Sequence, residues 1–217
     1  LTCDREVAQD LTRLFNQLSG YAPRSTFHRL LVAPLSIRDG LIERIQRQIA
    51  RKKAGEEAWI GIKVNSVVDE AVIDALYRAS QAGVPVDVQV RGICAIRAGV
   101  PGLSENIRVR SILGRYLEHS RIYAFGPKGE EEVWIGSADL MHRNLDRRVE
   151  ALVRIADPRQ VSYLAELVRR GVSPKTSSWA LKKRGEWKRQ QYAKDGSLLS
   201  DVQEELMEEA SSRVVGR

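Results

Sequence analysis

The chain has 217 residues, which is enough for one well-buried domain with or without a tail. Hydrophobic residues make up 43% and charged residues 29%, as is ordinary for a soluble globular protein. The net charge of +7 comes with 28 acidic residues, which excludes a nucleic-acid-binding composition throughout the chain. The excess of Lys and Arg over Asp and Glu predicts a positive surface that attracts polyanions, although a solvated surface of mixed charge is the simpler interpretation.

Cysteine content and hydropathy limit the class of protein further. The two cysteines, Cys3 and Cys94, have no regular spacing, so we expect free thiols in a reducing compartment. No C-x-x-C motif or His/Cys array predicts a zinc site. No apolar run approaches the roughly 20 residues that span a bilayer, and early charge at residues 1–5 argues against a signal peptide. Leu1 in place of Met suggests a piece of a longer, cytoplasmic protein.

The first ninety residues alternate between amphipathic helices and short apolar strands. The expected elements are a helix at 7–18, a strand at 30–32, a helix at 37–54, a strand at 59–64, a helix at 68–79 and a strand at 86–90. Ser36 and Asp39 have the spacing of a capping box. Strands and helices in this order imply parallel strands with right-handed crossovers, and ligands bind beyond the carboxyl ends of such strands. Arg91 is therefore placed for an anion, with a structural ion pair as the alternative.

The second half predicts more strands and one further helix. A strand at 107–111 is followed by strands at roughly 118–125 and 132–137, joined by an evident hairpin turn, and by a strand at 147–155. Asp157-Pro158 starts a helix that Gly171 ends, which completes an α/β domain.

The composition changes after this helix. Residues 175–194 contain seven Lys/Arg and one Glu, interleaved with Trp179, Trp187 and Tyr192, while residues 201–209 are acidic and helix-prone. Basic residues with aromatics can bind single-stranded nucleic acid, but we expect a tail whose aromatic side chains pack on the domain.

Candidate catalytic residues gather between 119 and 148. On a strand, His119, Arg121 and Tyr123 would share one face, because side chains alternate with period two. An imidazole beside a guanidinium suits phosphoryl transfer: the histidine can attack phosphorus or move a proton, and the arginine can neutralise phosphate oxygens as a bidentate fork. Gly136 would let its backbone approach a phosphate, and Ser137 adds a hydroxyl donor.

Further polar residues follow the same hairpin. Arg143 and Arg148 bracket Asn144 and could add two cationic contacts, with Arg91 as a third. A half-buried strand histidine is the alternative for His119, and the number of suitable neighbours favours a site. We interpret His28 and His142 as structural or surface residues, although His142 is close enough to Asn144 to line the site.

Three stretches closely resemble the larger bacterial polyphosphate kinases. They are VRGIC at 90–94, YLEHSRIY at 116–123 and GSADLMHRNLDRRVE at 136–150, and the resemblance extends from about residue 1 to about residue 170. It implies an α/β fold with a phospholipase D-like catalytic domain at 1–172, built on a mixed, mostly parallel sheet flanked by helices. A basic, then acidic, helical tail would occupy 173–217. Against the general phospholipase D pattern, Arg121 replaces the usual lysine and Asp139 the usual asparagine.

The resemblance also implies an activity: reversible transfer of the ATP γ-phosphate to inorganic polyphosphate. This chain would be the last of four domains, and the phosphorylated histidine and the magnesium ligands would lie outside it, so the fragment alone is expected to be inactive. His119 matches a second histidine that contacts nucleotide phosphates and assists as acid or base. Arg91 matches a nucleotide-phosphate ligand and Arg148 a further phosphate contact; Arg121, Ser137, Arg143 and Asn144 are neighbours in the same motif.

The implied partners are ATP, ADP, polyphosphate, the preceding domains and, in the full-length enzyme, further copies of the chain; nucleic acid is not expected. The implied location is cytoplasmic, with peripheral membrane association.

Two other hypotheses stay open on the residues alone. A phospholipase D-type phosphodiesterase or nuclease would need two H-x-K/R motifs and so a dimer, and a non-enzymatic basic module would merely hold a polyanion.

Overall fold

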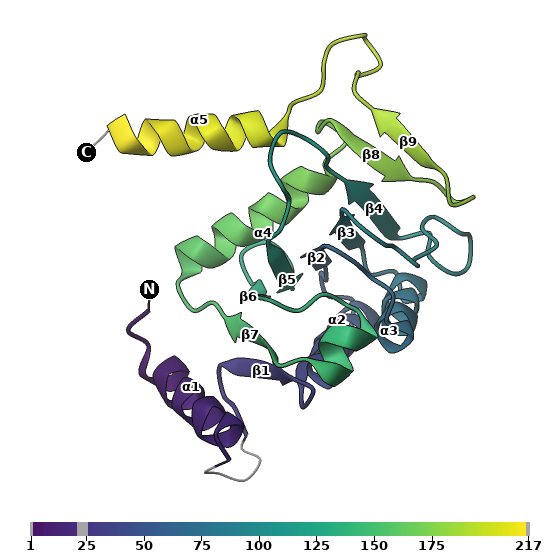
Figure 1. Cartoon of the computed structure of the whole chain (residues 1–217). Coiled ribbons are helices and arrows are strands. Elements are labelled where there is room, and N and C mark those ends of the chain that lie inside the picture. Colours follow the sequence, from purple (N-terminus) through teal and green to yellow (C-terminus); the bar gives the residue numbers. More distant parts are fainter. Residues whose placement is uncertain (1, 21–25, 216–217) are drawn as a thin grey trace.

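Nine strands form a single sheet within residues 2–20 and 26–215, which are the residues that the computed structural model describes (Figure 1). Leu1, which suggested a longer parent protein, lies outside them. The strands are β1 (Leu30–Ala33), β2 (Ile60–Val64), β3 (Val86–Val90), β4 (Ile107–Ser111), β5 (Arg121–Phe125), β6 (Glu132–Gly136), β7 (Glu150–Arg154), β8 (Ser178–Leu181) and β9 (Trp187–Gln190). Their order across the sheet is β1-β7-β6-β5-β2-β3-β4-β8-β9.

The sheet is mixed, but the expectation that it is mostly parallel was wrong. Only β2–β3 and β3–β4 pair in parallel among the described strands, and the other six pairings are antiparallel. A short turn joins β5 to β6, and β8 and β9 form a hairpin. Short connections can only join antiparallel neighbours, whereas parallel strands need a crossover.

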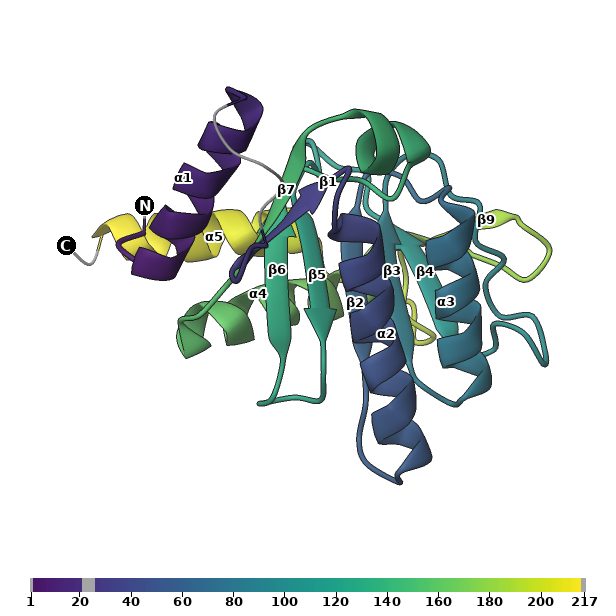
Figure 2. The ribbon, with the colours of Figure 1, turned by 90° about the horizontal axis from the view of Figure 1, so that it is seen from below.

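Helices cover both faces of the sheet (Figure 2). Helices α2 (Ile37–Lys53) and α3 (Glu70–Gln81) pack on one face, and α4 (Pro158–Val172) packs on the other. Strand β5 has apolar side chains on both faces, and each face is covered by helices. Tyr123 and Phe125 join the core under α2 and α3, while Ile122 and Ala124 face α4.

Several element boundaries differ from the sequence-based expectation. Helix α2 has no side-chain cap, because the hydroxyl of Ser36 instead accepts a hydrogen bond from Val32 N at 3.0 Å, so the predicted capping box was wrong. Strand β5 begins at Arg121 rather than near residue 118, and β7 begins at Glu150 rather than at 147. The start of α4 at Asp157-Pro158 is confirmed, with Asp157 accepting two backbone N–H groups.

The basic segment at 175–194 is a β-hairpin rather than part of a helical tail (Figure 1). Strand β8 pairs with β4, and β9 pairs with β8, so the hairpin extends the central sheet. The expectation that its aromatic side chains pack on the domain was wrong for Trp187, which is 37% exposed, and for Tyr192, which is 61% exposed, whereas Trp179 is half-buried. The acidic segment is helical as expected, in α5 (Val202–Val215).

Two helices flank this core. Helix α1 (Arg5–Leu18) is joined to the strand region through the buried carboxylate of Asp10, which accepts hydrogen bonds from the backbone of His28, Arg29 and Leu30. Helix α5 is joined to α4 by Arg170, which pairs with Glu205 at 2.6 Å and with Glu209 at 2.7 Å. None of the described helices has the length and apolar character that crossing a membrane requires.

Candidate functional site

The candidate site lies at one edge of the sheet, where the carboxyl ends of β2, β3 and β6 meet the amino ends of β5 and β7. In Figure 2 this is the upper edge, beneath the short π-helix η1 (Arg143–Arg147). Backbone hydrogen bonds join the three segments that leave these strands: Gly92 N to Asn65 O at 2.7 Å, Val67 N to Ile93 O at 2.8 Å and Leu140 N to Ser66 O at 3.1 Å. The floor of the site is therefore built from main chain.

His119 and Arg121 meet at this edge, although not in the predicted way. His119 precedes β5, so the two side chains do not share a strand face; the expectation of one strand through both was wrong. Arg121 Nη1 instead donates to the His119 carbonyl oxygen at 2.6 Å and lies 3.0 Å from His119 Nδ1. His119 is exposed, while the Arg121 side chain is 12% exposed. The imidazole is thus accessible to solvent, and its orientation is set by Arg121.

The guanidinium fork of Arg121 is occupied by a carboxylate. Nη2 of Arg121 lies 3.0 Å from Asp139 Oδ2 and Nε lies 3.3 Å from Asp139 Oδ1. Arg121 was predicted to hold phosphate oxygens with this fork; in the structure the fork binds Asp139, because both groups are largely buried and each neutralises the other. Arg121 therefore positions its neighbours.

Asp139 connects this pair to the next strand ends. Asn65 donates its backbone N–H to Asp139 Oδ1 at 2.7 Å and its side-chain Nδ2 to Oδ2 at 3.0 Å. Arg91 Nε in turn donates to Asn65 Oδ1 at 2.6 Å. Burial opposes ionisation of Asp139, but the hydrogen bonds from Arg121 and Asn65 outweigh it and lower the pKa of the carboxyl group. A continuous network thus runs from His119 to Arg91.

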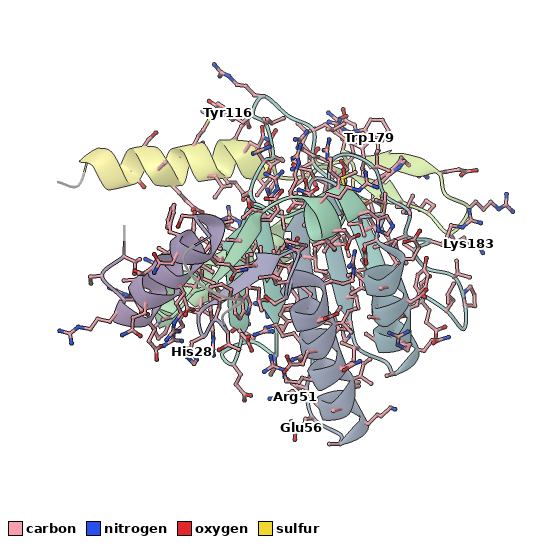
Figure 3. All side chains as sticks on the ribbon, turned by 60° about the horizontal axis from the view of Figure 1, so that its bottom comes forward. His28, Arg51, Glu56, Tyr116, Trp179 and Lys183 are labelled. Atoms are coloured by element: carbon pink, nitrogen blue, oxygen red, sulfur yellow. The ribbon has the colours of Figure 1, made fainter. Side chains whose placement is uncertain are left out.

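The segment that carries His119 is held from two further directions. Lys63, a nearly buried cation in the middle of β2, pairs with Glu118 at 2.8 Å and donates to the Ser120 hydroxyl at 2.7 Å. From the other side, Gln203 of α5 donates to Glu118 Oε1 at 2.7 Å. Figure 3 shows Tyr116, from the same segment, beside the start of α5. His119 is thus the exposed member of an anchored segment.

Sequence reasoning missed Asn65, Lys63 and Gln203. Asn65 directly follows a buried strand, as Arg91 does, and that position was a usable signal. Lys63 interrupts the apolar run of β2, which is a second signal, because an unpaired lysine would be costly there. Gln203 carried no signal, since its role depends on contact with residues more than 80 positions away.

The remaining predicted residues divide into exposed and buried ones. Arg143 and Arg148 are exposed and form no ion pair within the described part of the chain. Ser137 is exposed, and its hydroxyl accepts from Ala151 N at 3.3 Å. Asn144 is only 3% exposed and donates to Glu150 Oε1 at 2.5 Å, so its side chain turns into the protein instead of lining an open site.

Gly136 has a structural role that differs from the predicted phosphate approach. A Cβ atom built on Gly136 would lie 1.9 Å from the carbonyl oxygen of Ala151 in the paired strand β7. Only glycine allows β6 and β7 to approach this closely, and the requirement comes from packing between strands.

His142 lies among acidic side chains and is more than an isolated surface residue. Its Nε2 is 2.7 Å from Glu70, and its Nδ1 is 3.3 Å from Asp146 and 3.7 Å from Asp69. Arg38 bridges Asp69 and Asp146 from the other side. The hydrogen bond to Asp146, followed by that to Glu70, raises the pKa of His142. Among the described residues, no group of three or more His, Cys, Asp or Glu side chains is arranged to hold a metal ion.

Comparison with known proteins gives a consistent result. Residues 30–201 match the family model described as polyphosphate kinase C-terminal domain 2. The chain is 62% identical over 208 residues to a polyphosphate kinase of Streptomyces coelicolor and 51% identical over 217 residues to one of Mycobacterium leprae. It covers 28% and 29% of the length of these relatives, which in turn cover 96% and 98% of the chain.

Solved structures show the same relationship. The crystal structure of polyphosphate kinase from Porphyromonas gingivalis superposes with a TM-score of 0.91 at 32% identity, covering all of this chain and 33% of that one. Nuc from Salmonella typhimurium, a phospholipase D family member, superposes with a TM-score of 0.50 at 16% identity, over 66% of this chain and 91% of that one. The second likeness concerns the fold alone.

Proposed function

Because the chain belongs to the polyphosphate kinase family, we propose that it forms one half of a site that transfers the ATP γ-phosphate reversibly to inorganic polyphosphate. The observation that supports this most is the network that runs from Arg91 through Asn65, Asp139 and Arg121 to His119. It fixes an exposed imidazole and a cation on one rigid edge, as binding of a multiply charged phosphate requires.

In the proposed reaction, the nucleophile is a histidine of a preceding domain, as the family resemblance implies. Its nitrogen bonds to the γ-phosphorus, the bond from that phosphorus to the β-phosphate oxygen breaks, and ADP leaves. The terminal phosphate oxygen of the polymer then attacks the same phosphorus and displaces the histidine. Any magnesium would be bound outside this chain.

His119 would donate a hydrogen bond or a proton to the phosphate oxygens on which negative charge builds. Arg91 is fixed through Nε, so its two terminal nitrogens can face a phosphate. The exposed Arg143 and Arg148, which follow β6 at the same edge, would neutralise further phosphate charge, and the Ser137 hydroxyl could donate to it. Arg121 acts through His119, and Asn144 acts by supporting the segment after η1.

The decisive experiment compares His119→Ala with His28→Ala in the full-length enzyme that contains this chain. His28 is exposed and lies on the opposite side of the molecule from Tyr116 in Figure 3. We expect His119→Ala to lower the rate of ATP-dependent polyphosphate synthesis by about 100-fold or more, the usual contribution of an acid–base group, and His28→Ala to leave it unchanged.

Wild-type rates in His119→Ala would contradict the assigned role. Robust synthesis by the 217-residue chain alone would contradict the division of the site between domains. A homo-oligomeric enzyme and a cytoplasmic location, with peripheral membrane association, stay predictions of the resemblance.

A further inference from the structure

The hairpin β8–β9 and its flanking loops, residues 175–194, form a cluster of unpaired cations that we call the basic hairpin. It carries seven Lys/Arg and one Glu. None of the seven forms an ion pair within the described part of the chain, whereas several arginines elsewhere, including Arg38, Arg44 and Arg121, are paired with carboxylates. Figure 3 shows Lys183 at the outer end of the hairpin, far from Tyr116.

Two grooves border the basic hairpin, and Arg110 of β4 lines both. The first has a volume of about 600 Å³ and is lined by Arg108, Lys182, Lys183 and Arg184, with two acids, Glu105 and Glu186. The second has a volume of about 750 Å³, and its charged lining is wholly cationic: Arg110, Lys175, Lys188, Arg189 and Lys194. Neither groove is lined by His119 or Arg91, so both lie apart from the candidate transfer site.

Lysines on an edge strand also serve to prevent pairing with other sheets. That explanation covers the exposed residues of β9, but it does not account for the cations of the loops before and after the hairpin, or for Arg110. Arg110 is part-buried, is held by Ser178 and Gln190, and lies on an inner strand. Cations that converge from several elements on an acid-free groove indicate an anionic ligand.

We propose that the basic hairpin binds a stretch of the polyphosphate chain outside the transfer site. The inference rests on the proposed function, which supplies a linear polyanion as substrate. Binding of several successive phosphates would release counterions and keep the polymer close to the active site between transfers. Single-stranded nucleic acid fits less well, because it needs a row of aromatic platforms for successive bases. Of the three aromatic residues of the basic hairpin, only Tyr192 lines the acid-free groove; Trp187 is 37% exposed but lines neither groove, and Trp179 is half-buried.

The test compares two fourfold charge-neutralised variants of the full-length enzyme. The first, Lys183→Gln/Arg184→Gln/Lys188→Gln/Arg189→Gln, changes exposed residues of the hairpin. The matched control, Lys52→Gln/Lys53→Gln/Arg78→Gln/Lys128→Gln, removes the same charge from exposed positions elsewhere. Equilibrium binding of long-chain polyphosphate, of tripolyphosphate and of a single-stranded oligoribonucleotide is measured without ATP, over a range of salt concentrations.

We expect the hairpin variant to bind long-chain polyphosphate about tenfold more weakly, with the slope of log affinity against log salt reduced by about 3. Affinity for tripolyphosphate and the behaviour of the control should change less than about twofold. Unchanged long-chain affinity, an equal loss in the control, or a loss confined to the oligoribonucleotide would each overturn the proposal. If the fourfold variant does not fold, Lys183→Gln/Arg184→Gln at the turn gives the same comparison with a smaller shift.

Failure of this proposal is distinguishable from failure of the proposed function. Binding is measured without turnover, so it reports on the hairpin whatever the rate of His119→Ala. A normal rate in that variant would remove the assigned catalytic role and leave the binding result standing.

Discussion

Gln203 donates a hydrogen bond from Nε2 to Glu118 Oε1 at 2.7 Å, although 85 residues separate the two along the chain. The same side chain accepts from Tyr116 N at 2.8 Å and donates to Tyr116 O at 2.9 Å. Gln203 is 5% exposed, so these bonds are shielded from water. The last helix of the structure therefore helps to position the segment that carries His119.

Replacing Gln203 by Ala removes all three bonds, each worth about 1 kcal/mol, and should free residues 116–119. We expect a lower kcat for polyphosphate synthesis, by about tenfold, with little change in KM for ATP. Steady-state kinetics of the full-length enzyme provide the measurement, with Gln46→Ala, an exposed glutamine of α2, as the control. A change in thermal stability alone, without a change in kcat, would show that the contact is merely structural.

Lys63 and Glu118 form a largely buried ion pair, with side chains 9% and 17% exposed. Lys63→Met should lower the free energy of unfolding by about 3–5 kcal/mol, because the carboxylate loses its partner. The double variant Lys63→Met/Glu118→Gln should recover much of this loss. Denaturant unfolding of the four proteins in this double-mutant cycle measures the coupling, and Lys53→Met, at an exposed position, is the control. Additive effects would contradict the pairing.

Asp139 makes stability depend on acidity. Its pKa is lower in the folded protein than in the unfolded chain, so its ionised form stabilises the fold above the ordinary aspartate pKa. That stabilisation is lost as pH falls through the folded-state pKa. Asp139→Asn should therefore be less stable than wild type at neutral pH and should lose less stability on acidification. Unfolding at several pH values measures both slopes; Asp74→Asn, at an exposed position on α3, should follow wild type.

The stabilisation that His142 contributes depends on pH in the opposite direction. Its pKa is raised in the folded protein, so the protonated form stabilises the fold below the ordinary histidine pKa, and this contribution disappears as pH rises through the raised pKa. Asp146→Asn and Glu70→Gln should each lower the pKa of His142 toward its ordinary value, because each carboxylate hydrogen-bonds the imidazole. Titration of the imidazole by NMR provides the measurement, and an unchanged pKa in Asp146→Asn would contradict the cause assigned.

Local patterns predicted those parts of the fold that depend on neighbours in sequence. The apolar runs of β2 and β3 and the Asp157-Pro158 start of α4 are examples, and Arg91 was placed by its position after β3. The hairpin β8–β9 was missed because its charged residues hide the strand alternation, and its pairing with β4 joins positions about 70 residues apart. The fork of Arg121 was assigned to phosphate because nothing local shows that Asp139 folds back onto it.

Backbone hydrogen bonds among the segments after β2, β3 and β6 also protect the amide groups at this edge of the sheet from hydrogen exchange. The amide groups of Val67, Gly92 and Leu140 each bond to another of these segments. Their exchange with deuterium requires these segments to separate from one another and should be slower than that of loop amides without a hydrogen bond. Asn65 and Arg91 directly follow β2 and β3 on this floor, so the position of the Arg91 guanidinium should depend little on local opening of the surrounding loops.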